Sequence, residues 1–192
     1  MSRFVEPPWE AELDVPRALA AIPPSATIAG MFFLATLEGA KRRGVSLPGT
    51  RDRYLPFNFY PVSEFAPLLV AASGRFYPER SLREGLRAIG VVAPAVFSGS
   101  VLGKVTLGSA IGVQACIEAI AKTYPINIRP STCTVGEITD HSCVVSLHDV
   151  FHFLDSHHVG VFEGTLRHAG VEGHVSIASR SDVSAELLLQ WA

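Results

Sequence analysis

The spacing of apolar residues changes near Tyr124, and this change constrains the fold more than any other feature of the sequence. Before it, apolar residues recur at intervals of three, four and seven, the period of an amphipathic helix. After it, apolar and polar residues alternate, the period of a half-buried strand. The pattern predicts one domain over 25–192, made of a helical half over 25–123 and a sheet half over 124–192.

Four helices are expected in the helical half, over 27–43, 63–72, 81–90 and 108–122. The face of the first that should be buried carries Ile28, Met31, Phe32 and Ala35. The second contains Pro67, which is expected to bend its first turn. Ser81 and Glu84 have the spacing of a capping box at the start of the third helix. The fourth has few charges, so we expect it to be largely buried.

In the sheet half, the pattern predicts elements in the order strand, strand, helix, strand, strand. A hairpin covers 131–138 and 142–150, and two further strands cover 173–179 and 185–191. The helix over 157–169 is expected to be capped by Asp155 or Ser156 and to end at Gly170. Gly160 and Gly164 inside this helix predict close contact with the sheet. This order makes an antiparallel sheet with helices on one face, an α+β fold.

Residues 1–24 hold five of the thirteen prolines and predict an irregular arm that docks through Phe4 and Trp9. The first residues lack the basic stretch and apolar run of a secretory signal. The most apolar window, 27–36, is shorter than the roughly 20 residues that a membrane span needs. We therefore expect a cytoplasmic protein without a membrane span.

The composition argues against several classes of protein. Sixteen basic residues oppose eighteen acidic ones without a long basic run, which argues against nucleic-acid binding. The three cysteines lack the spacing of a zinc ribbon or a disulfide framework. Hydrophobic residues make up 48% and charged residues 18%. This balance fits a well-filled core, an internal apolar pocket or a surface buried against a second copy.

The segment "HDVFHFLDSHH", residues 148–158, holds four of the seven histidines. It lacks the H-E-x-x-H spacing, so a zinc site would have to be assembled from loop geometry. The ligands of that alternative would be His148, His152, Asp155 and His158. The favoured interpretation is surface histidines beside a helix start, and no metal or other cofactor is predicted.

The segment "RYLPFNFYP" suggests a site for an anionic ligand with a flat apolar part, because arginine and aromatic rings occur together. Its residues are Arg53, Tyr54, Phe57 and Tyr60. The alternative is that these rings fill the junction between the two halves. No P-loop and no hydrolase motif is present, so no catalytic residue is assigned.

Several segments carry a family resemblance, among them "GMFFLATLEGAKRRG", "RYLPFNFYPVSEFAPLLVAA", "FYPERSLREGLRAIG" and "HHVGVFEGTLRHAGVEGHV". In this order the chain resembles a paralogous family of uncharacterised myxobacterial proteins. More distantly, the order of elements is similar to the superfamily of haem–NO-binding, 4-vinyl-reductase-like and vesicle-tethering domains. The first histidine is His141, in the sheet half, so a haem ligand from the helical half is missing and haem is disfavoured.

The leading hypothesis is a non-enzymatic sensory or interaction module that binds a small apolar or amphipathic ligand, or a protein partner. The apolar composition and the architectural resemblance motivate it. Two alternatives remain open: a metal-binding protein or metalloenzyme that uses the histidine segment, and a homo-oligomeric scaffold.

Overall fold

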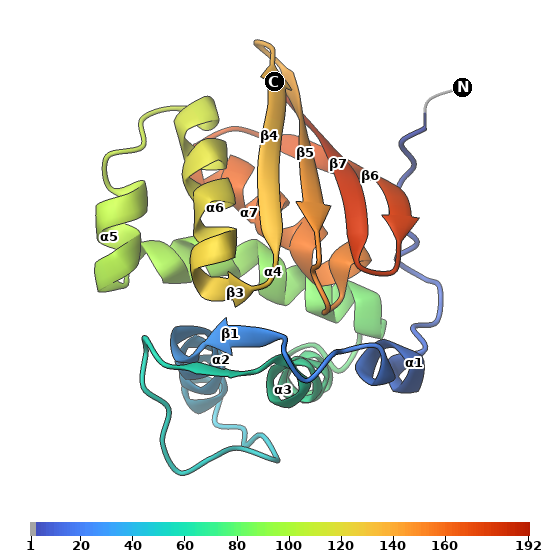
Figure 1. Ribbon diagram of the computed structural model, residues 1–192, viewed down its shortest axis with the longest axis vertical. Helices are drawn as coiled ribbons and strands as arrows, with labels where there is room; N and C mark the ends of the chain where they lie inside the picture. The colour runs from blue at the N-terminus through green and yellow to red at the C-terminus, as the bar shows by residue number, and fades with distance from the viewer. Residues whose placement is uncertain (1–2) are drawn as a thin grey trace.

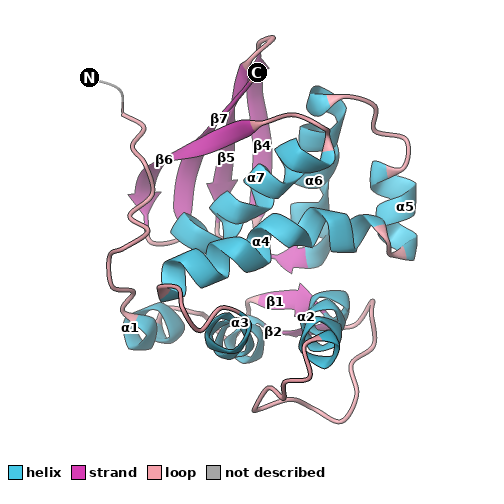
Figure 2. Ribbon diagram, turned by 180° about the vertical axis from the view of Figure 1, so that it is seen from behind, coloured by secondary structure: helices cyan, strands magenta, loops and turns pink. Residues whose placement is uncertain are grey.

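In the computed structural model, which describes residues 3–192 except for the side chains of residues 101 and 102, four antiparallel strands form the main sheet. They are β4 (Thr132–Ile138), β5 (Ser142–His148), β6 (Gly173–Ser181) and β7 (Ser184–Trp191), in the spatial order β4-β5-β7-β6. Helices α4 (Leu82–Ser98) and α7 (Val159–His168) cross in front of this sheet in Figure 2. The arrangement confirms the predicted α+β class.

The remaining helices are α1 (Val15–Ala20), α2 (Gly30–Arg42), α3 (Val62–Phe76), α5 (Val101–Leu107) and α6 (Val113–Asn127). Figure 1 shows α4 between the main sheet and a lower layer that contains α2 and α3. The division of the domain at residue 124 stays a prediction.

Several local expectations are confirmed. Both hydrogen bonds of the capping box join Ser81 and Glu84 at the start of α4. Gly44 and Gly170 follow α2 and α7 with φ of +67° and +82°, a conformation that glycine adopts without steric cost. Helix α3 passes through Pro67, whose ring faces solvent, and the predicted bend of its first turn stays a prediction.

The first predicted helix differs from the structure at its start and in its buried face. The segment predicted as this helix begins with a short strand, β1 (Thr27–Ala29), which pairs with β2 (Phe59–Pro61) and β3 (Ile128–Arg129) in a second sheet. The most buried side chains of α2 belong to Phe33, Thr36 and Ala40. The run "MFFL" places apolar residues in every helical phase, so the pattern could not select this face.

The fourth predicted helix begins later than expected. Helix α6 starts at Val113 and buries one face, which includes Cys116, Ile117 and Ile120, but Ile111 precedes the helix with 91% of its surface exposed. The sequence did not predict α5, which lies between α4 and α6.

The glycines of α7 contact α4 rather than the sheet, so the predicted partner was wrong. A Cβ atom at Gly160 would clash with the backbone of Arg87, and one at Gly164 with the backbone of Val91. Gly90 of α4 meets the backbone of His157 in the same way. Glycine on both helices therefore lets the two backbones touch.

The N-terminal arm is docked along the sheet and α4. Val5 pairs with Ile177 of β6, and the backbone oxygen of Trp9 accepts a hydrogen bond from the Ser81 hydroxyl, with 2.7 Å between the two oxygens. Residues 1–2 of the predicted arm lie outside the described part of the chain. Among the helices of residues 3–192, none combines the length and the apolar character needed to cross a bilayer.

Candidate functional site

The connection between β5 and α7 has an unusual backbone. Asp149 and Phe153 have positive φ angles of 56° and 50°. Residues Leu154–His158 then form a π-helical turn, η1, that continues directly into α7. Positive φ is rare for an aromatic residue, and π-turns and strained residues concentrate at functional sites. The local geometry therefore marks this connection as a candidate site.

Three histidine rings meet at this turn in the interior of the protein. His152, His157 and His158 are only 3%, 7% and 2% exposed. The ring of His158 lies 4.6 Å from that of His152 and 5.2 Å from that of His157, measured between centroids. Phe65 of α3 packs edge-on against His152 at 5.8 Å. We call His152, His157 and His158 the histidine cluster.

The hydrogen bonds of the cluster form a short relay that ends at one unpartnered atom. The Tyr124 hydroxyl lies 2.9 Å from Nδ1 of His158, and Nε2 of His158 lies 3.2 Å from Nε2 of His152. Within the described residues, Nδ1 of His152 is buried and has no hydrogen-bond partner. Such a buried polar atom costs about 1–3 kcal/mol, so its presence needs an explanation.

The protonation states along the relay follow from the chemistry of neutral imidazole, which has one N–H group and one lone pair. If the Tyr124 hydroxyl donates to His158, then His158 donates to His152, and Nδ1 of His152 carries a hydrogen. If the relay is reversed, Nδ1 of His152 carries a lone pair. The first state lets this atom donate a hydrogen bond to a ligand, and the second lets it coordinate a metal centre.

Burial keeps the cluster uncharged near neutral pH. It lowers the pKa of His152 to about 3 and that of His157 to about 4, and it lowers the pKa of His158 well below 6.5. The mutual repulsion of the rings adds to this effect at His152 and His158. Burial also raises the pKa of Tyr124, so the relay consists of neutral groups.

Two ion pairs fasten the segment around the cluster to α4. Arg87 binds Glu163 of α7 through two hydrogen bonds of 2.7 and 2.8 Å. Glu163 is 4% exposed, and its hydrogen bond is the main reason that the pKa of Arg87 is raised. Arg83 pairs with Asp155 of η1. Movement at the cluster is therefore linked to α4 by charge as well as by packing.

The structure differs from the sequence interpretation of the histidine segment. His152, His157 and His158 are buried, not at the surface. Of the alternative zinc ligands, only His152 and His158 come together, because His148 is exposed at the end of β5 and Asp155 pairs with Arg83. Across residues 3–192, no three His, Cys, Asp or Glu side chains form a group that could hold a metal ion.

The residues of the predicted ligand site are divided between the core and the surface. Tyr54 stacks on Phe33 with 4.3 Å between ring centroids, and its ring meets that of Tyr60 edge-on at 5.0 Å. The side chains of Arg53 and Phe57 are exposed, Phe57 by 66%. The two tyrosines pack against Phe33 of α2, and the assignment of a ligand to the four residues stays a prediction.

Sequence reasoning missed His157 and Tyr124. Adjacent histidines point in different directions on a regular helix, but the π-turn and the neighbouring rings bury both His157 and His158. Tyr124 precedes Pro125 at the end of a helix, and nothing in the sequence relates it to His158. The density of histidines was the one available signal.

Comparison with protein families decides the family. The profile described as "Protein of unknown function (DUF2378)" matches residues 21–192, which is nearly the whole chain. The chain belongs to the DUF2378 family. Its family region begins after most of the N-terminal arm. Among curated proteins, none matches this DUF2378 sequence.

The fold of this DUF2378 protein is similar to that of solved H-NOX proteins. The Fe(II) unliganded H-NOX protein from K. algicida superimposes with a TM-score of 0.63 at 15% identity, covering 86% of this chain and 97% of that chain. The S. oneidensis H-NOX protein in the Fe(II)NO ligation state gives 0.62 at 10% identity, covering 86% and 99%. At these identities the likeness shows a shared fold.

A third similar structure comes from work on haem distortion in the H-NOX family, with a TM-score of 0.57, 14% identity and coverage of 84% and 92%. These neighbours overturn the expectation that haem is disfavoured. That expectation required a histidine in the helical half of the sequence. In the fold, however, His152 and His158 of the sheet half lie against Phe65 of α3 and Tyr124 of α6. The position of a histidine in the sequence therefore did not exclude haem.

Proposed function

We propose that this protein is a sensory domain that binds a small ligand at the histidine cluster and signals occupancy through the contact between α4 and α7. The observation that carries the proposal is the unpartnered Nδ1 of His152, a polar atom held in the interior at the end of a hydrogen-bonded relay. The H-NOX-like fold supports it, because an H-NOX neighbour is described in an Fe(II)NO ligation state.

Ligand entry would have to change the packing around the cluster. Phe65 and Tyr124 lie against the histidine rings, and Gly90 brings the backbone of α4 against His157. A ligand at His152 would displace these groups, and the Arg83–Asp155 and Arg87–Glu163 pairs would carry the displacement to α4. Closely packed helices have a few discrete arrangements rather than a continuous range of positions. Ligand binding would therefore shift the contact between α4 and α7 from one arrangement to another.

Haem is the first candidate ligand, since the donor chemistry of the cluster fits it. Neutral imidazole nitrogen is a common axial donor to haem iron, and Nδ1 of His152 has no competing hydrogen bond among the described residues. His152 would hold the iron, and His158 and Tyr124 would set the protonation state of His152 through the relay. A bound haem would supply an iron centre for a diatomic ligand.

The test is titration of the purified protein with haemin, followed by visible absorption. We expect saturable binding of one haemin per chain and loss of the coordinated-haem spectrum in His152→Ala. The matched control is His148→Ala, which removes an exposed histidine of the same segment and should bind like the wild type. The fold of each variant is checked by thermal unfolding.

Two results would contradict the proposed site. The first is a wild-type protein that shows no coordinated-haem spectrum and no protection of residues 150–165 from hydrogen exchange when haemin is added. The second is a spectrum that survives in a folded His152→Ala variant, because haemin would then be bound elsewhere. The myxobacterial origin and a protein partner that receives the signal are further parts of the proposal.

A further inference from the structure

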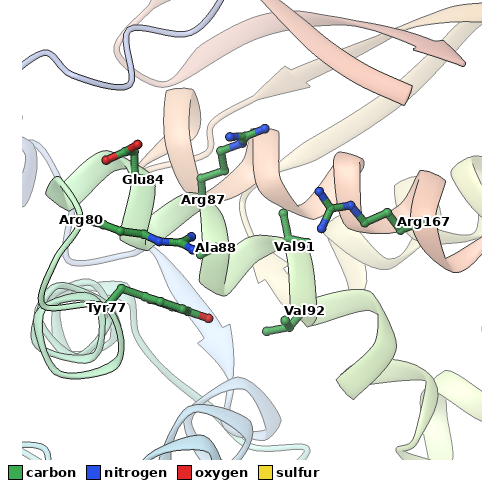
Figure 3. A pocket seen from close by; sticks show the side chains of 8 residues that line it. All are labelled: Tyr77, Arg80, Glu84, Arg87, Ala88, Val91, Val92 and Arg167. Carbon is green, nitrogen blue, oxygen red and sulfur yellow. The ribbon is translucent and has the colours of Figure 1, made fainter. Parts of the chain in front are cut away.

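A surface groove of about 280 Å³ lies along the outer side of α4, away from the histidine cluster. Figure 3 shows its floor of small apolar side chains from α4 and arginine side chains that extend over this floor from both ends. The lining residues are Tyr77, Arg80, Glu84, Arg87, Ala88, Val91, Val92 and Arg167. Sites for small molecules typically measure about 300–1,000 Å³, so the groove lies just below that range and suits only a small ligand.

We propose that this groove binds a small anion with a flat apolar part, such as an aromatic phosphate or carboxylate. The site goes beyond the proposed sensory function, since it is open to solvent and shares no residue with the histidine cluster. Arginine suits such a ligand because its planar guanidinium pairs with two oxygens at once. The apolar floor would receive the ring, and Val92 there is 46% exposed.

Arg167 is the first reason to expect an anion. Its side chain forms no hydrogen bond or ion pair within the described residues, and in Figure 3 it reaches from the end of α7 toward Val91. An exposed guanidinium beside an apolar surface, without a counterion, can donate hydrogen bonds to an anion.

Arg80 is the second available donor. It pairs with Glu79 at 3.5 Å, but both side chains are about half exposed or more, so this pair is weak and exchangeable. Its guanidinium lies 5.0 Å from the centre of the Tyr77 ring. Figure 3 shows Arg80 and Tyr77 side by side at the end of the groove opposite Arg167. The sequence predicted an arginine next to aromatic rings at residues 53–60. The same combination of side chains lines this groove.

The acidic groups near the groove limit the ligand that it can hold. Glu84 is one wall, and its pKa is lowered by the hydrogen bonds from Ser81, so it is ionised at neutral pH. Glu163 already neutralises Arg87 through Nε and Nη2. The net attraction for an anion thus comes from Arg80 and Arg167, which favours one phosphate or carboxylate over a highly charged ligand.

The groove is also joined to α7 through Arg87. The Nη1 group of Arg87 makes no hydrogen bond in the described structure, whereas its other two nitrogens bind Glu163. An anion that binds Nη1 would compete with Glu163 for the same guanidinium. Occupancy of the groove would therefore loosen one of the two ion pairs between α4 and the segment that carries the histidine cluster.

The experiment is an NMR titration of the ¹⁵N-labelled full chain with phenyl phosphate. We expect saturable shifts of amides in residues 77–92 and 164–170, weaker binding at higher salt, and weaker binding of inorganic phosphate and phenol than of phenyl phosphate. Arg167→Gln and Arg80→Gln should each weaken binding by about tenfold, the loss expected for one charge-assisted hydrogen bond. The melting temperature of Arg167→Gln should match that of the wild type.

Arg53→Gln is the matched control, because Arg53 is an exposed arginine of the other predicted ligand site. Unchanged binding in this variant supports the groove. Three outcomes would overturn the assignment: no saturable shift with phenyl phosphate, equal binding by Arg167→Gln and the wild type, or a loss of binding only in Arg53→Gln. A failure of haemin to bind the histidine cluster would leave this result unaffected, so the two proposals can fail separately.

Discussion

The buried face of the main sheet and the crossing of α4 with α7 are equally well shielded from water but differ in chemistry. The sheet buries apolar side chains such as Val145, Leu147, Leu187 and Leu189. The crossing buries His157, His158, Glu163 and Thr165, and glycines hold its backbones in contact. Apolar burial stabilises a fold, whereas buried polar and charged groups often cost free energy relative to apolar residues of the same shape. Apolar burial alone therefore does not explain the choice of residues at the crossing.

The largest predicted effect concerns the histidine cluster, which should make the folded protein less stable at acid pH. The pKa values of His152 and His157 fall from 6.5 to about 3 and about 4 on folding, and that of His158 also falls. The unfolded chain therefore binds more protons between pH 6.5 and about 4. Their contribution to stability is complete above pH 6.5, and the free energy of unfolding should fall by on the order of 5 kcal/mol between pH 7 and pH 5.

Urea unfolding at several pH values measures this loss. The variant His152→Phe should reduce the pH slope by about a third, because one of the three buried imidazoles is removed. The slope, not the absolute stability, is the readout, since Phe also removes the partner of His158 Nε2. An unchanged slope in a folded variant would mean that His152 does not contribute to acid destabilisation.

The next effect concerns the backbone contact at the crossing. Gly164→Ala places a Cβ against the Val91 backbone, which cannot move aside as a flexible side chain can. We expect a loss of about 4 kcal/mol or more, or failure to fold. Gly74→Ala is the matched control, because a Cβ at this position of α3 meets no atom within 4 Å. It should stabilise the protein by about 0.5–1 kcal/mol, as alanine favours a helix.

These two substitutions are compared by urea or thermal unfolding. The same chemical change is expected to have opposite signs in two helices, which isolates the effect of the contact between α4 and α7. A Gly164→Ala protein as stable as the wild type would contradict close packing at the crossing and would make this region resemble an ordinary helix surface.

The smallest effect is the response of the Arg87–Glu163 pair. Arg87→Met leaves the Glu163 carboxylate buried without its partner, so we expect a loss of about 2–3 kcal/mol, reduced because Arg87 is partly exposed. The double variant Arg87→Met/Glu163→Leu should recover much of this loss, since it makes the crossing chemically like the sheet interior. If the double variant is less stable than Arg87→Met, the pair stabilises the fold and the contrast between the two regions is weaker than we infer.

Much of the fold could be predicted from the sequence because its signals are local. Alternation identified the strands β4 to β7, and the S-x-x-E spacing identified the start of α4. The buried face of α2 could not be predicted because "MFFL" is apolar in every helical phase. The partner of Gly164 could not be predicted because a glycine in a helix indicates a close contact but does not indicate which element makes it.

The sequence by itself determined the fold class, the strand, strand, helix, strand, strand order of the C-terminal half and the presence of an unusual density of histidines. Only the tertiary structure decided that His152, His157 and His158 are buried together, that Tyr124 completes their relay, and that Arg80 and Arg167 face one groove. The physical reason is the range of the interactions. Periodicity and capping depend on residues within one or two turns, whereas the site joins rings and charges that are separated by up to about 90 positions and meet only when the helices pack on the sheet.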